Sequence, residues 1–190
     1  FQSLRQPMTK DWISLAERPG WLRLKGNEPT VSRFRQSLVA RRVQDFNVEV
    51  STEIDFQPES FKQMAGLIAY YDTENHYYLR ISCNDEGTRG LNIIRTEAGP
   101  SGELLEQDVH LPDEGTLHLG MCIQQTKLWF TYSLDGENWL RIGPELDSHI
   151  LSDDYNHLGF TGAFVGLCAQ DQLCKESHAD FRYFHYRELG

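Results

Sequence analysis

Long apolar runs are missing from this sequence of 190 residues, and none approaches the roughly 18 residues that a membrane-spanning helix needs. The opening segment FQSLRQPMTK has neither the basic start nor the apolar block of a signal peptide. Basic residues are in deficit, because 18 Lys and Arg stand against 28 Asp and Glu and give a net charge of -10. This balance argues against nucleic acid and anionic membranes as partners, whereas a neutral partner such as a sugar is compatible with it.

Cysteine is scarce, and the four thiols, at Cys83, Cys122, Cys168 and Cys174, form no C-x-x-C pair. Three of them lie in apolar strand patterns, which favours reduced core thiols in a cytoplasmic protein. A Cys168–Cys174 bridge is the alternative. The spacing of His and Cys along the chain does not suit a zinc site.

Familiar catalytic motifs are also missing: there is no G-x-S-x-G, H-E-x-x-H, P-loop or G-x-G-x-x-G. Acidic pairs occur at Asp72/Glu74, Asp85/Glu86, Asp113/Glu114 and Asp153/Asp154. All of these pairs lie in predicted turns, where Asp accepts hydrogen bonds from backbone donors. A small glycan-active enzyme with a carboxylate pair hidden in the turns is therefore the least favoured hypothesis. The seven scattered histidines are expected at the surface or at strand edges.

What the sequence does contain is strand pattern, most clearly in Lys127–Ile142, KLWFTYSLDGENWLRI. Apolar and polar residues alternate up to Asp135-Gly136, and the apolar pattern resumes at Trp139. Alternation on both sides of Asp-Gly predicts a β-hairpin, because Gly accepts the positive φ of a tight turn. We expect Trp139 to pack across this hairpin onto the sheet core.

Similar patterns recur along the rest of the chain. Strands are predicted at Trp12–Ala16, Trp21–Lys25, Ser37–Val43, Phe46–Phe56, Met64–Tyr71, His76–Cys83, Gly90–Glu97, Gly115–Gln124, Phe160–Ala169 and His178–Glu188, with a weaker one at Glu103–Leu111. A short helical turn is expected within Asp147–Tyr155. Many short strands separated by turn signals predict an all-β fold, a two-sheet antiparallel sandwich or jelly roll that forms one domain over residues 1–190.

Two kinds of binding residue fit such a sandwich. Sandwiches of the sugar-binding type often hold one structural calcium ion, for which Asp153, Asp154 and Asp180 are candidates, although no loop shows a ligand pattern. We therefore predict no cofactor, with structural calcium as the alternative. Aromatic rings cover the apolar face of a sugar, and the chain offers Trp12, Trp21, Trp129, Trp139, Tyr70, Tyr71, Tyr77 and Tyr78. Most of these rings are expected to fill the core.

The stretch ILSDDYNHLGFTGAFVGLCAQD at Ile150–Asp171 resembles a known family. Together with Gln63–Leu79, Ser37–Arg42, Tyr132–Trp139 and the closing ADFRYFHYRE, it is similar to the C-terminal β-sandwich of glycoside hydrolase family 43 β-xylosidases and α-L-arabinofuranosidases. The resemblance extends over essentially the whole chain.

The resemblance implies a concanavalin A-like fold and a non-catalytic, accessory role. In these enzymes the catalytic carboxylates lie on a preceding five-bladed propeller, which hydrolyses terminal xylose or arabinofuranose with inversion. No propeller is present in these 190 residues, so we expect no hydrolysis by them alone. The implied partners are a family 43 catalytic propeller, a xylo- or arabino-oligosaccharide and, as is frequent in this family, further copies in a homo-oligomer.

The resemblance also implies a sandwich loop that places a phenylalanine in the wall of the propeller's sugar pocket. By position this residue lies in the FTGAF segment, where we favour Phe160 over Phe164; the alternative is that both rings are core. An apolar ring there would exclude water and block longer chains, which favours attack on terminal sugars. The competing hypothesis is an independent carbohydrate-binding module for xylan-type oligosaccharides, with Trp or Tyr lining a concave sheet.

Overall fold

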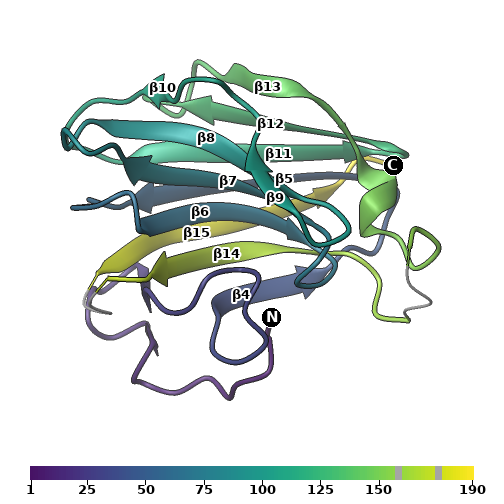
Figure 1. Cartoon of the computed structure of the whole chain (residues 1–190), viewed down its shortest axis with the longest axis horizontal. Helices are drawn as coiled ribbons and strands as arrows, with labels where there is room; N and C mark the ends of the chain where they lie inside the picture. Colours follow the sequence, from purple (N-terminus) through teal and green to yellow (C-terminus); the bar gives the residue numbers. More distant parts are fainter. Residues whose placement is uncertain (157–159, 174–176) are drawn as a thin grey trace.

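Two antiparallel β-sheets packed face to face make up almost all of the protein (Figure 1). The structure is a computed structural model, and it describes residues 1–156, 160–173 and 177–190. The predicted all-β, two-sheet sandwich is confirmed. No helix in these described ranges is long and apolar enough to cross a membrane.

Most strand bounds agree closely with the sequence patterns, but the weaker strand predicted at Glu103–Leu111 is wrong, because residues 104–108 form no strand. One sheet contains β1 (Gln2–Ser3), β4 (Ser37–Arg42), β6 (Gln63–Tyr70), β7 (His76–Cys83), β8 (Arg89–Thr96), β9 (Ser101–Glu103), β10 (Val109–His110) and β14 (Phe164–Asp171). The other contains β2 (Ile13–Ser14), β3 (Leu22–Lys25), β5 (Asn47–Asp55), β11 (Leu117–Gln124), β12 (Lys127–Ser133), β13 (Leu140–Asp147) and β15 (His178–Glu188). The predicted helical turn is the 3-10 helix η1 (Ser148–Leu151).

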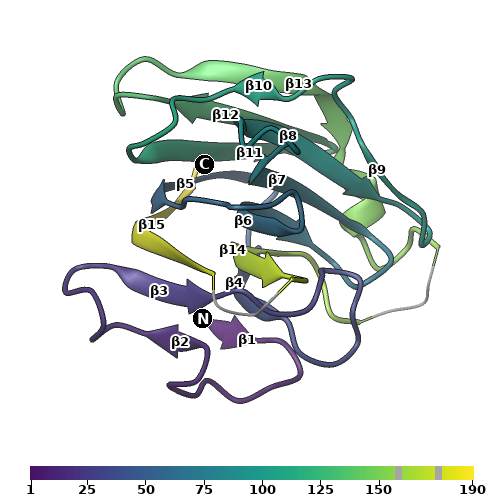
Figure 2. The same cartoon turned by 60° about the vertical axis from the view of Figure 1, so that its left-hand side comes forward.

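The strand order mixes segments that are distant in the sequence. The first sheet runs β1-β4-β14-β6-β7-β8-β10, with β9 pairing with β8, and the second runs β13-β12-β11-β5-β15-β3-β2. In Figure 2 the N-terminal strands β1, β2 and β3 lie beside β4 and the C-terminal β15. Both ends of the chain therefore contribute to the same side of the sandwich.

Period-2 alternation decides which side of each strand is buried. In β5, Val48, Val50 and Ile54 point between the sheets and are fully buried, while Glu49 points outward and is exposed. Together with side chains of the opposite sheet such as Leu67, they belong to one large apolar core. Each such aliphatic side chain contributes about 1.5–3 kcal/mol relative to an exposed one.

The first sheet is buried on its outer face as well. A second apolar cluster there contains Leu38, Ile68, Tyr70, Tyr78 and Cys168. Burial on both faces explains why the sequence of β6 is nearly all apolar and does not alternate.

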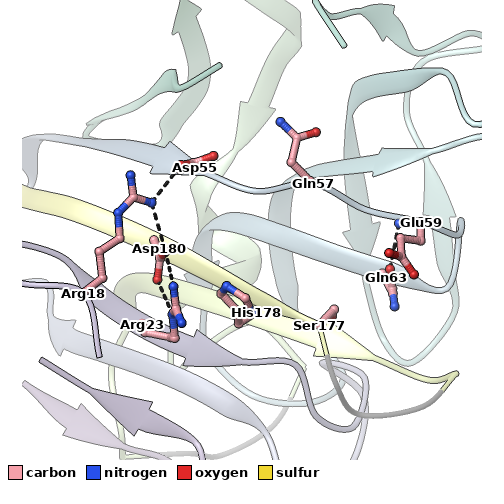
Figure 3. Close-up of a pocket in the computed structure, with 9 residues that line it drawn as sticks. All are labelled: Arg18, Arg23, Asp55, Gln57, Glu59, Gln63, Ser177, His178 and Asp180. Atoms are coloured by element: carbon pink, nitrogen blue, oxygen red, sulfur yellow. Dashed lines mark hydrogen bonds and ion pairs between the residues drawn. The ribbon is translucent and has the colours of Figure 1, made fainter. Parts of the chain in front are cut away.

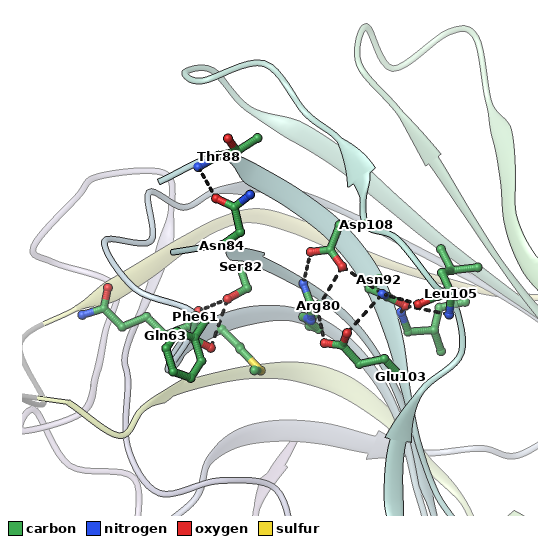
Figure 4. Close-up of polar contacts among 12 residues, drawn as sticks. Phe61, Gln63, Arg80, Ser82, Asn84, Thr88, Asn92, Glu103, Leu105 and Asp108 are labelled. Atoms are coloured by element: carbon green, nitrogen blue, oxygen red, sulfur yellow. Dashed lines mark hydrogen bonds and ion pairs between the residues drawn. The ribbon is translucent and has the colours of Figure 1, made fainter. Parts of the chain in front are cut away.

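A polar network covers the part of this outer face nearest to β8 and β9 (Figure 4). Arg80, almost fully buried, donates to both oxygens of Asp108, at 2.7 and 3.1 Å, and also pairs with Glu103. Asn92 adds a 2.8 Å hydrogen bond to Asp108. Burial alone would raise the pKa of Asp108, but the hydrogen bonds from Arg80 and Asn92 outweigh it and lower the pKa. These acids are structural partners of a buried cation.

The predicted hairpin is formed by β12 and β13, whose registered pairs include Phe130↔Ile142. Trp139 does not pack onto the core as expected. It is 40% exposed and lies on the outer face of the second sheet, against Gly120 of β11. A Cβ at position 120 would come within 2.9 Å of the indole ring, so the missing side chain makes room for it there.

The predicted reduced thiols are confirmed for the described residues: Cys83, Cys122 and Cys168 are free. Burial raises the pKa of Cys168 to about 12, which makes its thiol inert at neutral pH. Because Cys168 is free, the alternative bridge to Cys174 is wrong. Cys174 itself lies outside the described residues.

Candidate functional site

Phe160 is the most exposed of the large apolar side chains in the described structure, at 93%. The strand predicted to start at Phe160 begins four residues later, with Phe164 in β14. Phe160 therefore belongs to the loop that leads into β14, and its ring has no core to pack against. Phe46, at 80%, and Phe34, at 76%, are the next most exposed apolar rings.

The loop behind Phe160 is anchored by Asp153. One carboxylate oxygen, Oδ1, accepts hydrogen bonds from the Gly162 backbone N–H at 3.1 Å and from the Tyr71 hydroxyl at 2.9 Å. These two bonds, the Gly162 bond foremost, lower the pKa of Asp153. Gly162 has φ +68°, a left-handed conformation that favours glycine, and the Arg42 guanidinium lies where its Cβ would be.

Phe164 has a different environment from Phe160. It is half-buried at the start of β14, packs on the outer apolar cluster, and lies 5.0 Å beneath the Arg42 guanidinium. With Tyr70 and Leu38 it also lines a cavity of about 420 Å³. The structure thus separates the two candidate phenylalanines, since one is exposed and the other packs.

Phe46 is a second exposed ring at this end of the sandwich. Phe46 continues the apolar alternation of Val48 and Val50, which are buried, but its own side chain is 80% exposed. The reason is local: β5 begins one residue later, at Asn47, so Phe46 projects beyond the end of the sheet, where its carbonyl accepts a hydrogen bond from the Gln125 N–H. Phe46 borders a groove of about 860 Å³ that also includes Asp153 and Gly162. We call this surface, defined by Phe46, Phe160 and the groove that Phe46 borders, the Phe160 end.

The N-terminus also lies near the Phe160 end. Gln2 pairs with Ala40 in β4, whose next residues, Arg41 and Arg42, pair with Val165 and Phe164. Gln2 to Arg5 line the same cavity as Phe164 and Thr161. A polypeptide segment that preceded Phe1 would therefore meet the protein beside this surface.

The calcium candidates are divided between the two ends of the sandwich. Asp153 and Asp154 lie at the Phe160 end, whereas Asp180 lies near the start of β15, beside Asp55 at the far end of β5. In the described parts of the chain, no three His, Cys, Asp or Glu side chains are grouped as metal ligands. The three candidates cannot share one ion, and structural calcium stays a prediction.

A polar cavity of about 540 Å³ lies at this opposite end, which we call the Asp55 end (Figure 3). Arg18 Nη1 contacts Asp55 at 2.7 Å and Asp180 at 3.0 Å, and Arg23 Nε contacts the other oxygen of Asp180 at 2.8 Å. Burial alone would raise the pKa of Asp180, but hydrogen bonds from Arg23 and Arg18 outweigh it and lower the pKa. Sequence patterns gave no sign of this cavity, because its residues come from three separate segments.

Most candidate sugar-stacking aromatics fill the interior, as expected. Trp12, Tyr70, Tyr71, Tyr77 and Tyr78 are buried. The remaining three tryptophans lie on the outer face of the second sheet. Trp139 has been described above, and the other two are half-buried beneath guanidinium groups. These are Trp21, 4.0 Å from Arg18, and Trp129, 5.0 Å from Arg141.

One histidine contradicts the expected surface location. His76 is fully buried between the Asp72 carbonyl and the Thr30 hydroxyl, at 3.0 and 2.9 Å from its two ring nitrogens. Burial lowers its pKa to about 4. His76 is a neutral structural side chain at physiological pH.

Comparison with known proteins gives a consistent result across the chain. The family model described as "Beta xylosidase C-terminal Concanavalin A-like domain" matches residues 1–187. A xylan 1,3-β-xylosidase of a Vibrio species is 42% identical over 190 residues, covering 99% of this chain and 35% of that protein. Xylosidase/arabinosidase 43B of Humicola insolens is 44% identical, covering 100% of this chain and 36% of that protein.

A solved structure agrees with these sequence relatives. The xylan β-1,4-xylosidase of Bacillus halodurans C-125 superposes with a TM-score of 0.95 at 44% identity, covering 98% of this chain and 36% of that one. The chain therefore spans about a third of the length of the relatives that it matches.

Proposed function

This chain belongs to the family of β-xylosidase C-terminal concanavalin A-like domains, and we propose that it packs on a family 43 catalytic propeller and closes the sugar pocket of that propeller with Phe160. The residues that match are those of the C-terminal domain, so the catalytic domain of the family is not among them. The proposed substrate is a xylo- or arabino-oligosaccharide, in keeping with the xylosidase and arabinosidase names of the relatives.

The exposure of Phe160 is the observation that carries this proposal. A phenylalanine ring gains about 1.5–3 kcal/mol when it leaves water, and the ring of Phe160 is 93% exposed. The segment that follows Phe160 is nonetheless held in place, because Asp153 accepts a hydrogen bond from the Gly162 backbone. An apolar side chain on an anchored loop is suited to enter a site on another surface at little cost in ordering.

The position of the N-terminus supports the same arrangement. A C-terminal domain is joined to its catalytic partner through its own first residues, and here these residues line the cavity beside Phe164 and Thr161. A preceding domain would thus be delivered to the Phe160 end. The exposed ring of Phe46 gives that end a second apolar contact.

The test is a chimera in which this chain replaces the equivalent C-terminal part of the Bacillus halodurans xylosidase. Phe160→Ala should lower kcat/KM on xylobiose by about 10- to 200-fold, the usual effect of removing apolar contact from a substrate pocket. Phe61→Ala is the matched control, because Phe61 is also exposed but lies two residues before Gln63, which lines the cavity at the opposite, Asp55 end. Unchanged kinetics in Phe160→Ala, with the chimera folded, would remove Phe160 from the pocket.

Independent carbohydrate binding is the second candidate function. One observation favours it: the polar cavity at the Asp55 end, which lies far from the surface proposed to meet the propeller.

A further inference from the structure

We propose that the cavity at the Asp55 end binds a neutral polyhydroxylated ligand, a pentose unit of a xylan-type chain. Its volume of about 540 Å³ falls within the ~300–1,000 Å³ range of small-ligand clefts. Nine side chains line it, and Figure 3 shows that all of them are polar. The proposal does not depend on docking through Phe160.

The floor of the cavity is a pre-formed, charge-balanced cluster. Arg18 and Arg23 face Asp55 and Asp180, with N···O distances of 2.7–3.0 Å. The Arg18 guanidinium also lies 4.0 Å from the ring of Trp21, which restricts its movement. Guanidinium and carboxylate groups fixed in this way can form hydrogen bonds to a ligand without losing further conformational entropy on binding.

The charge balance selects the class of ligand. Both arginines of the described lining are already paired with carboxylates, and Glu59 at the rim would repel an anion. Both oxygens of Asp180 are occupied by guanidinium groups, which argues against a metal ion. Every lining side chain carries a polar group, and an apolar ligand would leave these groups without hydrogen-bond partners. The class of ligand that remains is a neutral molecule rich in hydroxyl groups.

Four polar side chains around this floor have unused hydrogen-bonding capacity. The side chains of Gln57, Glu59 and His178 make no hydrogen bond to any described residue. The Ser177 hydroxyl is buried and also lacks a partner within the described part of the chain. An unpaired buried hydroxyl is costly, and an amide, a carboxylate and an imidazole beside it offer the mixed donors and acceptors that vicinal sugar hydroxyls need.

The site would remain open in a protein docked through Phe160. Phe46 precedes β5 and Asp55 is its last residue, so the two ends are about 30 Å apart at the usual rise of a strand. A partner seated at the Phe160 end leaves the Asp55 end in solvent. A xylan chain bound in the cavity would therefore stay near the enzyme while the active site of the catalytic domain hydrolyses another chain end.

The test is an NMR titration of the 190-residue chain with xylobiose and xylotriose. Saturating shifts should cluster at the amides of Gln57, Glu59, Ser177 and His178. Gln57→Ala and Glu59→Ala should each weaken binding about tenfold, as expected for the loss of one good hydrogen bond. Both residues are exposed, so the variants should keep the wild-type spectrum elsewhere.

Phe160→Ala separates this proposal from the docking proposal, because it should leave xylotriose binding unchanged. The inference is overturned if the well-folded chain shows no shifts, if the shifts cluster at another surface, or if Gln57→Ala and Glu59→Ala bind as tightly as the wild type. Equal or tighter binding of xylonate, the acid of the same sugar, would also overturn it, because the ligand would then be an anion.

Discussion

The Tyr71 hydroxyl donates a 2.9 Å hydrogen bond to the Asp153 carboxylate, which joins the end of β6 to the loop that presents Phe160. Burial, together with the bond to Asp153, raises the pKa of Tyr71, so its proton stays available for donation. The same Asp153 oxygen accepts the Gly162 N–H. The exposed ring of Phe160 is therefore positioned by Tyr71 and Asp153, which are distant from each other in the sequence and do not contact the proposed pocket.

Tyr71→Phe should lower the activity of the chimeric xylosidase without unfolding the sandwich. Only the hydroxyl is lost, so Asp153 keeps its bond to Gly162 but loses the anchor to β6. We expect kcat/KM on xylobiose to fall about tenfold, since small displacements of a positioning group are costly in catalysis. Kinetics together with urea unfolding would measure both effects.

Tyr78→Phe is the matched control for this change. Its hydroxyl donates to the Cys168 carbonyl at 3.1 Å inside the outer apolar cluster, remote from the Phe160 loop. It should cost stability, about 1 kcal/mol for a typical hydrogen bond, and leave kcat/KM unchanged. Equal activity losses in the two variants would show that Tyr71 acts only through general stability.

Local patterns were sufficient to predict most of the strands. His76–Cys83 and His178–Glu188 were predicted with the bounds that the structure has, because alternation or continuous apolarity is a property of the strand itself. Glycine within a strand pattern is typical of a bulge or of a close approach by another backbone, and FTGAFVG contains two glycines. Gly162 has a positive φ, and Gly166 lies against the backbone of β4.

What the sequence could not predict depends on contacts between distant segments. Phe46 fits the alternation of β5 but lies just beyond the last residue that the opposite sheet covers. His76 is buried because the loop containing Thr30 folds over the outer face of the first sheet. The cavity at the Asp55 end combines residues 18–23, 55–63 and 177–180, and no local pattern relates these segments.

Gly166→Ala should destabilise the sandwich. A Cβ at position 166 would come within 2.3 Å of the Val39 carbonyl oxygen and 2.5 Å of the Ala40 Cβ, and neither can move without shifting β4. We expect a loss of about 1–3 kcal/mol or more, measured by urea unfolding. Gly102→Ala is the control, because nothing lies within 4 Å of its added methyl group. Similar stabilities for the two variants would contradict the close approach of β14 and β4.

Asp180→Asn should also be destabilising, because it leaves two guanidinium groups without their shared carboxylate. Asp180 has a side chain only 4% exposed, but Arg18 and Arg23 are partly in water, which reduces the usual loss for a buried pair to about 2–3 kcal/mol. Asp55→Asn removes one contact to Arg18 alone and should cost less. If both variants lose the same amount in thermal or urea unfolding, Asp180 is not the centre of the cluster.

The lowered pKa of Asp180 sets the pH range of this effect. A carboxylate whose folded pKa is below its unfolded value stabilises the fold above the unfolded value, near 3.9. The contribution is lost as the pH falls from there through the folded pKa. The stability difference between wild type and Asp180→Asn should therefore shrink only in strongly acidic buffer.

His76 should make the fold lose stability in a higher pH range than Asp180 does. Its pKa is about 4 in the folded protein, against an ordinary value of about 6.5. Between these values the unfolded chain binds a proton that the folded chain does not, so the free energy of unfolding falls as the pH drops from 6.5 to 4. The difference of about 2.5 units corresponds to about 3 kcal/mol, reached near pH 4, below which this group adds no further loss.

Urea unfolding at a series of pH values would measure this slope. His76→Gln should be less stable than the wild type at pH 7.5, because it loses the packing of the imidazole against Tyr70, but its stability should depend less on pH between 6.5 and 4. His185→Gln is the control, since His185 is exposed and should leave the slope intact. If the pH dependence of stability persists in His76→Gln, the group that titrates is another residue, because this variant lacks only the imidazole of His76.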